Sequence, residues 1–135
     1  MTPSLQPGNQ LLVSRAAYAA SRPFRGDVVV VVAPEGRHER YVKRVVGLPG
    51  EEVRLLDGAL LVDGARLDEP YLGGLPSSVG MGDSVWGLGP DEYFVLGDNR
   101  LRSTDSREYG PVGARLIVGR AWFRYWPPRG WGVIR

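Results

Sequence analysis

Lys43 is the only lysine in the chain, and the other sixteen basic residues are all arginines. Lysine can lose its proton when it is buried, whereas arginine stays charged in proteins. Apolar, strand-favouring residues precede it at 41–42 and follow it at 45–46. Lys43 is therefore a candidate general base. The more common alternative is a lysine whose stem covers apolar surface while its ammonium group stays in water.

A second polar stretch, residues 97–107, reads Gly-Asp-Asn-Arg-Leu-Arg-Ser-Thr-Asp-Ser-Arg and directly follows an apolar run. Ser103, Asp105 and Arg107 are spaced two apart, so they would share a face of an extended backbone. Asp105 and Arg107 could then pair, and the Ser103 hydroxyl would face a neighbouring group. The alternative is a solvated turn with an exposed ion pair, which contributes about 0–1 kcal/mol.

Short strands are the elements that must hold these two stretches. The 135 residues include 19 Gly and 11 Pro, too many for long helices, and the length fits one domain. Asp-Gly between apolar pairs is a strong hairpin signal, so residues 53–67 should form a meander that turns at 57–58 and 63–64. Residues 69–89 should be a long loop or minor insertion. We expect the other strands to begin or lie at 11–13, 28–33, 41–46, 93–96 and 116–126.

The composition excludes several kinds of site. The chain has no cysteine, so it can form no disulfide or thiolate metal site, and its single histidine, His38, argues against a histidine-based triad or metal cluster. We expect no cofactor. No run within this sequence approaches the roughly 18 apolar residues of a membrane span. The formal net charge is +2 and the arginines are scattered, so we expect no nucleic-acid partner.

The two polar stretches together resemble the type I signal peptidases. The resemblance is carried by Lys43 with the following Arg-Val-Val-Gly-Leu-Pro-Gly-Glu, and by Gly-Asp-Asn-Arg-x-x-Ser-x-Asp-Ser-Arg at 97–107. The Gly-Asp-Val-Val-Val at 26–30 looks like the family's Gly-Asp strand motif. Residues 1–9 look like its Met-x-Pro-Ser/Thr-Leu-x-x-Gly-Asp box, with Asn9 where Asp is usual. The motifs occur in the family's order over nearly the whole chain, and the end of the chain also resembles the family's last strand.

This resemblance implies a mostly β catalytic domain over residues 1–135, built as a coiled open antiparallel sheet or partly open barrel. The family's second, variable domain would be reduced to a hairpin and loop insertion at 55–89. The implied activity is a Ser–Lys endopeptidase that removes signal peptides from exported preproteins after an Ala-x-Ala-like site. The implied location is the extracytoplasmic face of the cytoplasmic membrane, and the implied partners are preprotein signal peptides and the membrane lipid surface.

The family's site residues carry over by position. Lys43 would be the general base, Ser103 would orient it, and Asp105 and Arg107 would hold their loop by a salt bridge. The pocket for the small residue at the cut would be lined by Met1, Leu5, Tyr41 and Val42. A second small-residue pocket would be lined by Leu11, Val30 and Val42. Because the family works at a membrane, we also expect exposed apolar side chains beside the groove, including Trp122, Trp126 and Trp131; the alternative is that every Trp lies in the core.

The resemblance also implies where the nucleophile lies. In the family the nucleophilic serine immediately precedes the Met of the first box, which is Met1 here. We therefore expect the nucleophile and the upstream membrane anchor to be missing from this sequence, and the chain starting at Met1 to be inactive. Ser4 occupies the Ser/Thr position inside the box and is not a candidate nucleophile. Two alternatives stay open: an inactive relative that binds extended peptides in a β groove, and another Ser–Lys processing peptidase.

Overall fold

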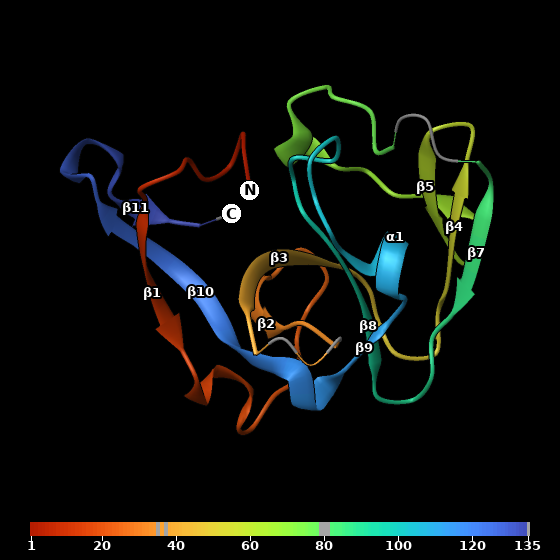
Figure 1. The fold of residues 1–135 in the computed structure, drawn as a ribbon, viewed down its shortest axis with the longest axis horizontal. Coiled ribbons are helices and arrows are strands. Elements are labelled where there is room, and N and C mark those ends of the chain that lie inside the picture. Colours follow the sequence, from red (N-terminus) through yellow and green to blue (C-terminus); the bar gives the residue numbers. More distant parts are fainter. Residues whose placement is uncertain (35, 37, 79–81, 135) are drawn as a thin grey trace.

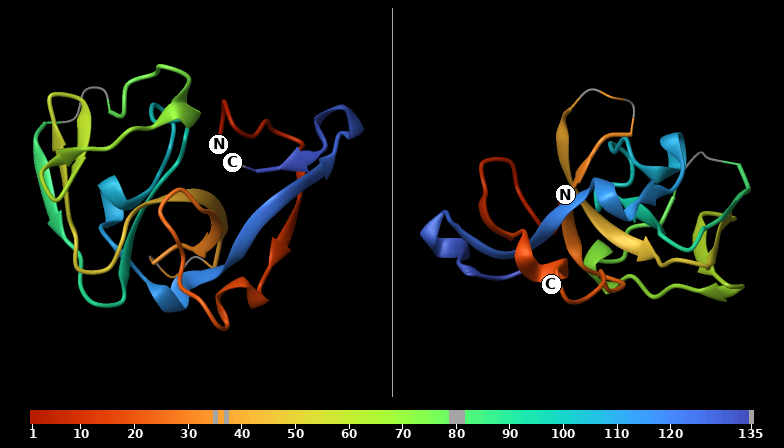
Figure 2. Two further views of the ribbon diagram at one scale, coloured as in Figure 1. Left: turned by 180° about the vertical axis from the view of Figure 1, so that it is seen from behind. Right: turned by 90° about the horizontal axis from the view of Figure 1, so that it is seen from below.

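Two antiparallel sheets make up the fold in the computed structural model, which describes residues 1–34, 36, 38–78 and 82–134 (Figure 1). The larger sheet has the strand order β1-β10-β2-β3-β8-β9, with β11 paired to β10, and the smaller has the order β6-β5-β4-β7. Figure 2 shows the smaller sheet and the β10–β11 ribbon at opposite ends of the molecule. The expected mostly β fold with a coiled, open antiparallel sheet is confirmed.

The larger sheet leaves part of β3 (Arg40–Gly47) without a partner on one side. β3 pairs with β2 from Val28 opposite Arg44 to Val32 opposite Arg40, but it pairs with β8 only from Arg44 onward. Among the described residues, no strand therefore covers the second edge of β3 over residues 40–43. The other strands of this sheet are β1 (Gln10–Ser14), β2 (Val28–Val32), β8 (Glu92–Leu96), β9 (Val112–Gly113), β10 (Ile117–Trp126) and β11 (Gly132–Val133).

The smaller sheet contains the predicted meander. Asp57 and Gly58 have φ values of 50° and 76°, and Asp63 and Gly64 have 48° and 82°, which is the left-handed pair that a two-residue hairpin of type I′ requires. The expectation of a loop over residues 69–89 is wrong in part, because β7 pairs with β4 there. The strands are β4 (Glu52–Leu56), β5 (Ala59–Val62), β6 (Ala65–Arg66) and β7 (Ser84–Gly87).

β3 joins the hydrophobic clusters of the two sheets. Successive side chains of a strand point to opposite faces, and Val45 and Val46 accordingly lie in different clusters. Val45 packs with the side chains of β2 and β8, whereas Val46 packs with Phe94 and with the buried residues of β4 and β5. The part of β3 that follows Lys43 is thus held from both faces of the sheet.

Helical turns are short in this fold. The polar stretch at 97–107 was expected to be extended or a solvated turn, but it leads into α1 (Ser106–Tyr109), whose N-cap is Asp105. The 3₁₀ turns are η1 (Ala16–Tyr18), η2 (Pro70–Leu72), η3 (Ala114–Leu116) and η4 (Pro128–Gly130). Over the part of the chain that the structure describes, no helix has the length and apolar character needed to cross a bilayer.

Candidate active site

The amine of Lys43 is buried and hydrogen-bonded to the hydroxyl of Ser103. Lys43 Nζ donates to Ser103 Oγ at 2.8 Å, across 60 residues of sequence. Lys43 is only 7% exposed, so the alternative of a lysine whose charged end extends into water does not describe this residue. β3 supplies the base candidate and the loop after β8 supplies its partner.

Burial lowers the pKa of Lys43 below the ordinary value for lysine. The charges of the neighbouring loop act in both directions, since Asp105 and Glu108 raise this pKa and Arg107 lowers it. The net direction is downward, because removing an ammonium group from water disfavours its charged form. A neutral amine is therefore available at a lower pH than for a free lysine.

Asp105 and Arg107 form a two-point ion pair beneath this amine. Arg107 Nε lies 2.9 Å from Asp105 Oδ1, and Arg107 Nη2 lies 3.0 Å from Oδ2. Both side chains are buried, so the pair is not the exposed, solvated turn of the alternative interpretation. The geometric reason given from the sequence was wrong, because Arg107 lies in the first turn of α1 rather than on an extended strand.

Asp105 also ties the loop to the end of β8. Its Oδ2 accepts from the Gly97 backbone N–H at 3.1 Å. Burial by itself would raise the pKa of Asp105, but the hydrogen bonds and charge of Arg107, together with hydrogen bonds from Ser103 and Gly97, lower it below its usual value. Asp105 is therefore a carboxylate that accepts hydrogen bonds from Ser103 and Gly97 while it pairs with Arg107.

Gly97 leaves no room for a side chain. A Cβ built there would lie 2.2 Å from Ser103 Oγ and 3.4 Å from Lys43 Nζ. The bond between Lys43 and Ser103 thus depends on glycine at the end of β8.

Replacing Gly97 with alanine should push Ser103 away from Lys43 and lower the free energy of unfolding by about 1–3 kcal/mol, the usual cost of overpacking. The nuclear Overhauser contact between the Lys43 Hε and Ser103 Hβ protons should disappear, and urea denaturation measures the stability. Gly87→Ala is the matched control, because nothing lies within 4 Å of a Cβ at Gly87. An unchanged Lys43–Ser103 contact in the Gly97→Ala protein would contradict this prediction.

An open groove of about 400 Å³ begins at Lys43. Five of the six residues predicted to contact substrate line it: Met1, Leu5, Leu11, Tyr41 and Val42. The sixth, Val30, pairs with Val42 across β2 and β3 and is not among the lining residues, so its role in a second pocket stays a prediction. Sequence reasoning missed the other lining residues, which all belong to the motifs at 1–9 and 97–107: Thr2, Gln6, Pro7, Asn9 and Asn99.

The α-amino group of Met1 lies within the electrostatic range of Lys43. Burial is the main cause that lowers the pKa of this amine, Asp98 raises it and Lys43 lowers it. The Asp98 backbone N–H also contacts Met1 Sδ at 3.4 Å. The start of the chain is therefore packed against the loop that carries the partners of Lys43.

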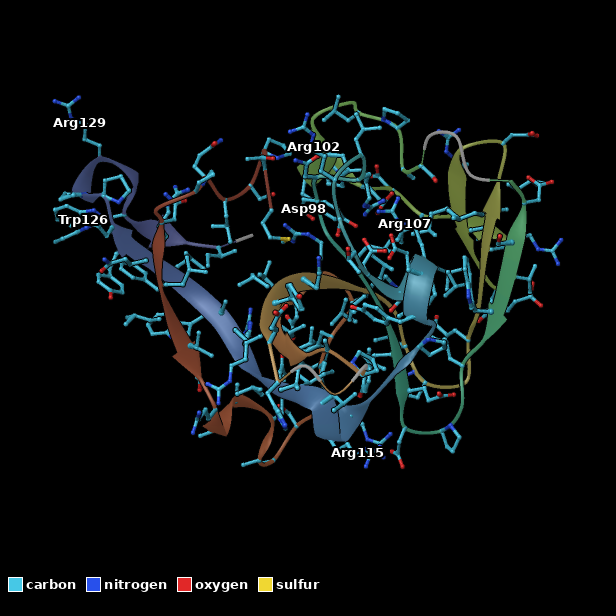
Figure 3. The ribbon with its side chains drawn as sticks, in the orientation of Figure 1. Asp98, Arg102, Arg107, Arg115, Trp126 and Arg129 are labelled. Atoms are coloured by element: carbon cyan, nitrogen blue, oxygen red, sulfur yellow. The ribbon has the colours of Figure 1, made fainter. Side chains whose placement is uncertain are left out.

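This arrangement can remove a proton from a group in the groove. A buried amine with a lowered pKa lines a groove beside the part of β3 that no described strand pairs with on its second edge. Figure 3 shows Asp98 and Arg107 in the interior of the molecule, whereas Trp126 and Arg129 lie at the far end of the β10 ribbon. No group of three or more His, Asp or Glu side chains in the described ranges is placed to hold a metal ion.

Comparison with known proteins gives similarity over most of the chain. A family model described as signal peptidase, peptidase S26, matches residues 1–126. Signal peptidase I of Bacillus caldolyticus is 41% identical over 94% of this chain and 75% of its own length. The probable signal peptidase I-2 of Synechocystis is 36% identical over 94% of this chain, which spans only 59% of that relative. The crystal structure of signal peptidase I from Enterococcus faecalis is 32% identical with a TM-score of 0.64, over 74% of this chain and 97% of that one.

Proposed function

Because the chain belongs to the signal peptidase family, peptidase S26, we propose that it is the catalytic domain of a serine endopeptidase that removes signal peptides from exported preproteins. The observation that carries the proposal is the buried Lys43 amine, hydrogen-bonded to Ser103 at the end of an open groove. Cleavage follows small, Ala-x-Ala-like residues. The enzyme works on the extracytoplasmic face of the cytoplasmic membrane.

In this proposal Lys43 is the general base of a Ser–Lys dyad. A neutral amine can take the proton of a serine hydroxyl, and the activated serine then attacks the scissile carbonyl. Ser103 orients the amine through the 2.8 Å hydrogen bond. Asp105 and Arg107 keep Ser103 in place.

The nucleophile in this mechanism is a serine bonded to the backbone nitrogen of Met1. Met1 and Lys43 line the same groove, which supports this placement. Lys43 would then interact with two hydroxyl groups, that of Ser103, which orients it, and that of the proposed nucleophile.

The substrate binds as an extended strand along the uncovered edge of β3. Residues 40–43 offer backbone groups for strand addition, and Met1, Leu5, Tyr41 and Val42 surround the adjacent groove. A groove of this kind would also suit the second candidate, an inactive relative that only binds extended peptides. Cleavage distinguishes the two candidates.

The test uses the protein with a serine before Met1 and the native residues that precede it in the gene. A preprotein with alanine at both the last and the third-last residue of its signal peptide should be cut after the last alanine. Changing that alanine to leucine should slow cleavage about 100-fold, because an oversized side chain cannot enter the groove. Binding without cleavage would favour the inactive relative, and cutting at unrelated positions would contradict the proposed specificity.

We place the lipid surface against the β10–β11 ribbon. Trp122, Trp126 and Trp131 are 42%, 51% and 64% exposed. Trp86 is half-buried against a core cluster, with its ring centroid 4.7 Å from that of Phe94, so the alternative in which every Trp lies in the core is wrong. Exposed aromatic side chains with a polar edge suit a membrane–water interface.

Replacing Trp122, Trp126 and Trp131 together with serine should weaken binding to vesicles of phosphatidylethanolamine and phosphatidylglycerol at least about tenfold, because apolar surface that enters the interface is lost. Co-sedimentation with vesicles measures the binding. The matched control replaces three apolar residues that are at least as exposed and lie outside the ribbon: Phe24, Leu75 and Leu101. Equal loss of binding in both triple variants would contradict the assignment of the surface.

A further inference from the structure

Ser4 connects the N-terminal segment to a buried ion pair. Its Oγ donates to Asp98 Oδ2 at 2.5 Å and accepts from Arg44 Nη2 at 3.2 Å. Arg44 also donates two hydrogen bonds directly to Asp98, from Nε to Oδ1 at 2.9 Å and from Nη2 to Oδ2 at 2.8 Å. Both charged side chains are fully buried. The Ser4 hydroxyl thus belongs to a charge-assisted network, in which hydrogen bonds are shorter and stronger than neutral ones.

Both members of this ion pair are chain neighbours of the site. Arg44 follows Lys43 on β3. Asp98 follows Gly97, whose backbone N–H is bound by Asp105 and which leaves room for Ser103. A displacement of the ion pair would therefore shift both Lys43, through Arg44, and Ser103, through Gly97.

The segment that Ser4 anchors is the one that begins at Met1. The Leu5 N–H donates to the Met1 carbonyl at 2.9 Å and closes a turn, and the Leu5 side chain is buried with Val28 and Ala121. Met1 Sδ contacts the N–H of Asp98, the residue that Ser4 binds. The hydroxyl of Ser4 is the polar side-chain link between this turn and the ion pair.

We propose that Ser4 is a positioning residue that sets the distance between Lys43 Nζ and the group bonded to the nitrogen of Met1. This inference rests on the proposed function, in which that group is the nucleophilic serine. Ser4 itself is not the nucleophile, because its hydroxyl is engaged with Asp98 and Arg44 rather than with Lys43. It acts by fixing the Met1–Leu5 turn against β3 and the end of β8.

The test compares Ser4→Val with Ser4→Thr, two side chains of the same shape of which only threonine keeps the hydroxyl. In the enzyme that carries a serine before Met1, Ser4→Val should lower kcat for preprotein cleavage about 100-fold relative to Ser4→Thr, the size of effect expected for a misplaced reacting group. KM and the pH midpoint set by Lys43 should be unchanged. Ser21→Val is the control for a serine-to-valine change, because Ser21 is exposed and its hydroxyl donates to the Ala17 carbonyl, outside the network of Ser4.

Equal kcat values per folded molecule for Ser4→Val and Ser4→Thr would overturn the inference. The inference would also be overturned if Ser4→Val and Ser4→Thr both lost kcat and folded protein to the same extent. A second measurement uses the 135-residue chain and needs no catalysis: hydrogen exchange at the Leu5 amide should be at least about tenfold faster in Ser4→Val than in Ser4→Thr. The Val45 amide, bonded to the Asp27 carbonyl, should exchange equally in both.

These readouts separate the two proposals. If the parent enzyme cuts no preprotein, the proposed function fails, and the exchange comparison still decides whether Ser4 holds the segment. If the parent cuts and Leu5 exchanges equally in the two variants, Ser4 is not the anchor.

Discussion

Replacing Lys43 with arginine should lower preprotein cleavage by at least about 10³-fold, within the range that a positioned base contributes. Arginine keeps the positive charge and much of the bulk of lysine, but its guanidinium does not lose its proton in a protein. The substituted side chain would thus fill nearly the same buried space, but it could not act as a base. Initial rates on a purified preprotein measure the effect.

The pH dependence follows from the same amine. Burial lowers the pKa of Lys43, so raising the pH through this lowered pKa deprotonates the base, and cleavage should rise with pH over that interval. Between this pKa and the higher pKa of the unfolded chain, the unfolded state binds more protons. The free energy of unfolding should therefore rise with pH in that window.

A single lysine makes this pKa directly measurable. NMR titration of the Lys43 side chain gives one resonance, since the chain holds no other lysine. Arg54→Lys adds an internal reference, because Arg54 is an exposed residue on β4 that pairs with the equally exposed Glu52. Lys43 should titrate at a lower pH than the introduced lysine. Equal titration of the two, or a Lys43→Arg enzyme that keeps more than about a tenth of its activity, would refute the base assignment.

Local sequence signals predicted the parts of the fold that depend on a few neighbouring residues. Asp57-Gly58 lies between apolar pairs and Asp63-Gly64 follows one, and both predicted hairpin turns, because few residues other than glycine and Asp or Asn adopt the left-handed backbone there. β7 was missed because its four residues lie in a Gly-rich stretch, and its position depends on pairing with β4. α1 was missed because a single turn has no periodicity, and its N-cap at Asp105 can also be explained as a strand residue.

For the site too, the sequence predicted some features and missed those that depend on long-range contacts. The lone lysine among arginines drew attention to Lys43, and the resemblance paired it with Ser103. That pair is brought together by the packing of β3 against the loop after β8, a contact across 60 residues that local spacing does not contain. The network of Ser4, Arg44 and Asp98 was missed for a related reason. Its members lie 40 and 54 residues apart, and each has an ordinary local explanation as a turn, strand or loop residue.

The 135-residue chain produced from Met1 should fold but should not cleave a signal-peptide substrate. Folding is expected because both sheets and the Lys43–Ser103 bond lie within the chain. Cleavage is not expected because this form lacks the serine before Met1 whose hydroxyl Lys43 would activate. Near-UV circular dichroism measures the folding, and release of the mature protein from one preprotein measures the cleavage.

Adding one residue before Met1 tests the position of the nucleophile. A serine there should restore some cleavage, and an alanine should restore none, although both lengthen the chain equally. The restored rate should stay well below that of the protein with its native preceding residues, because a terminal serine is frayed and upstream donors for the oxyanion are lacking. If the chain from Met1 and the alanine form cut as fast as the serine form, the nucleophile would lie elsewhere. Loss of that cleavage in Ser4→Val but not in Ser4→Thr would then identify the Ser4 hydroxyl as the nucleophile that attacks the scissile carbonyl.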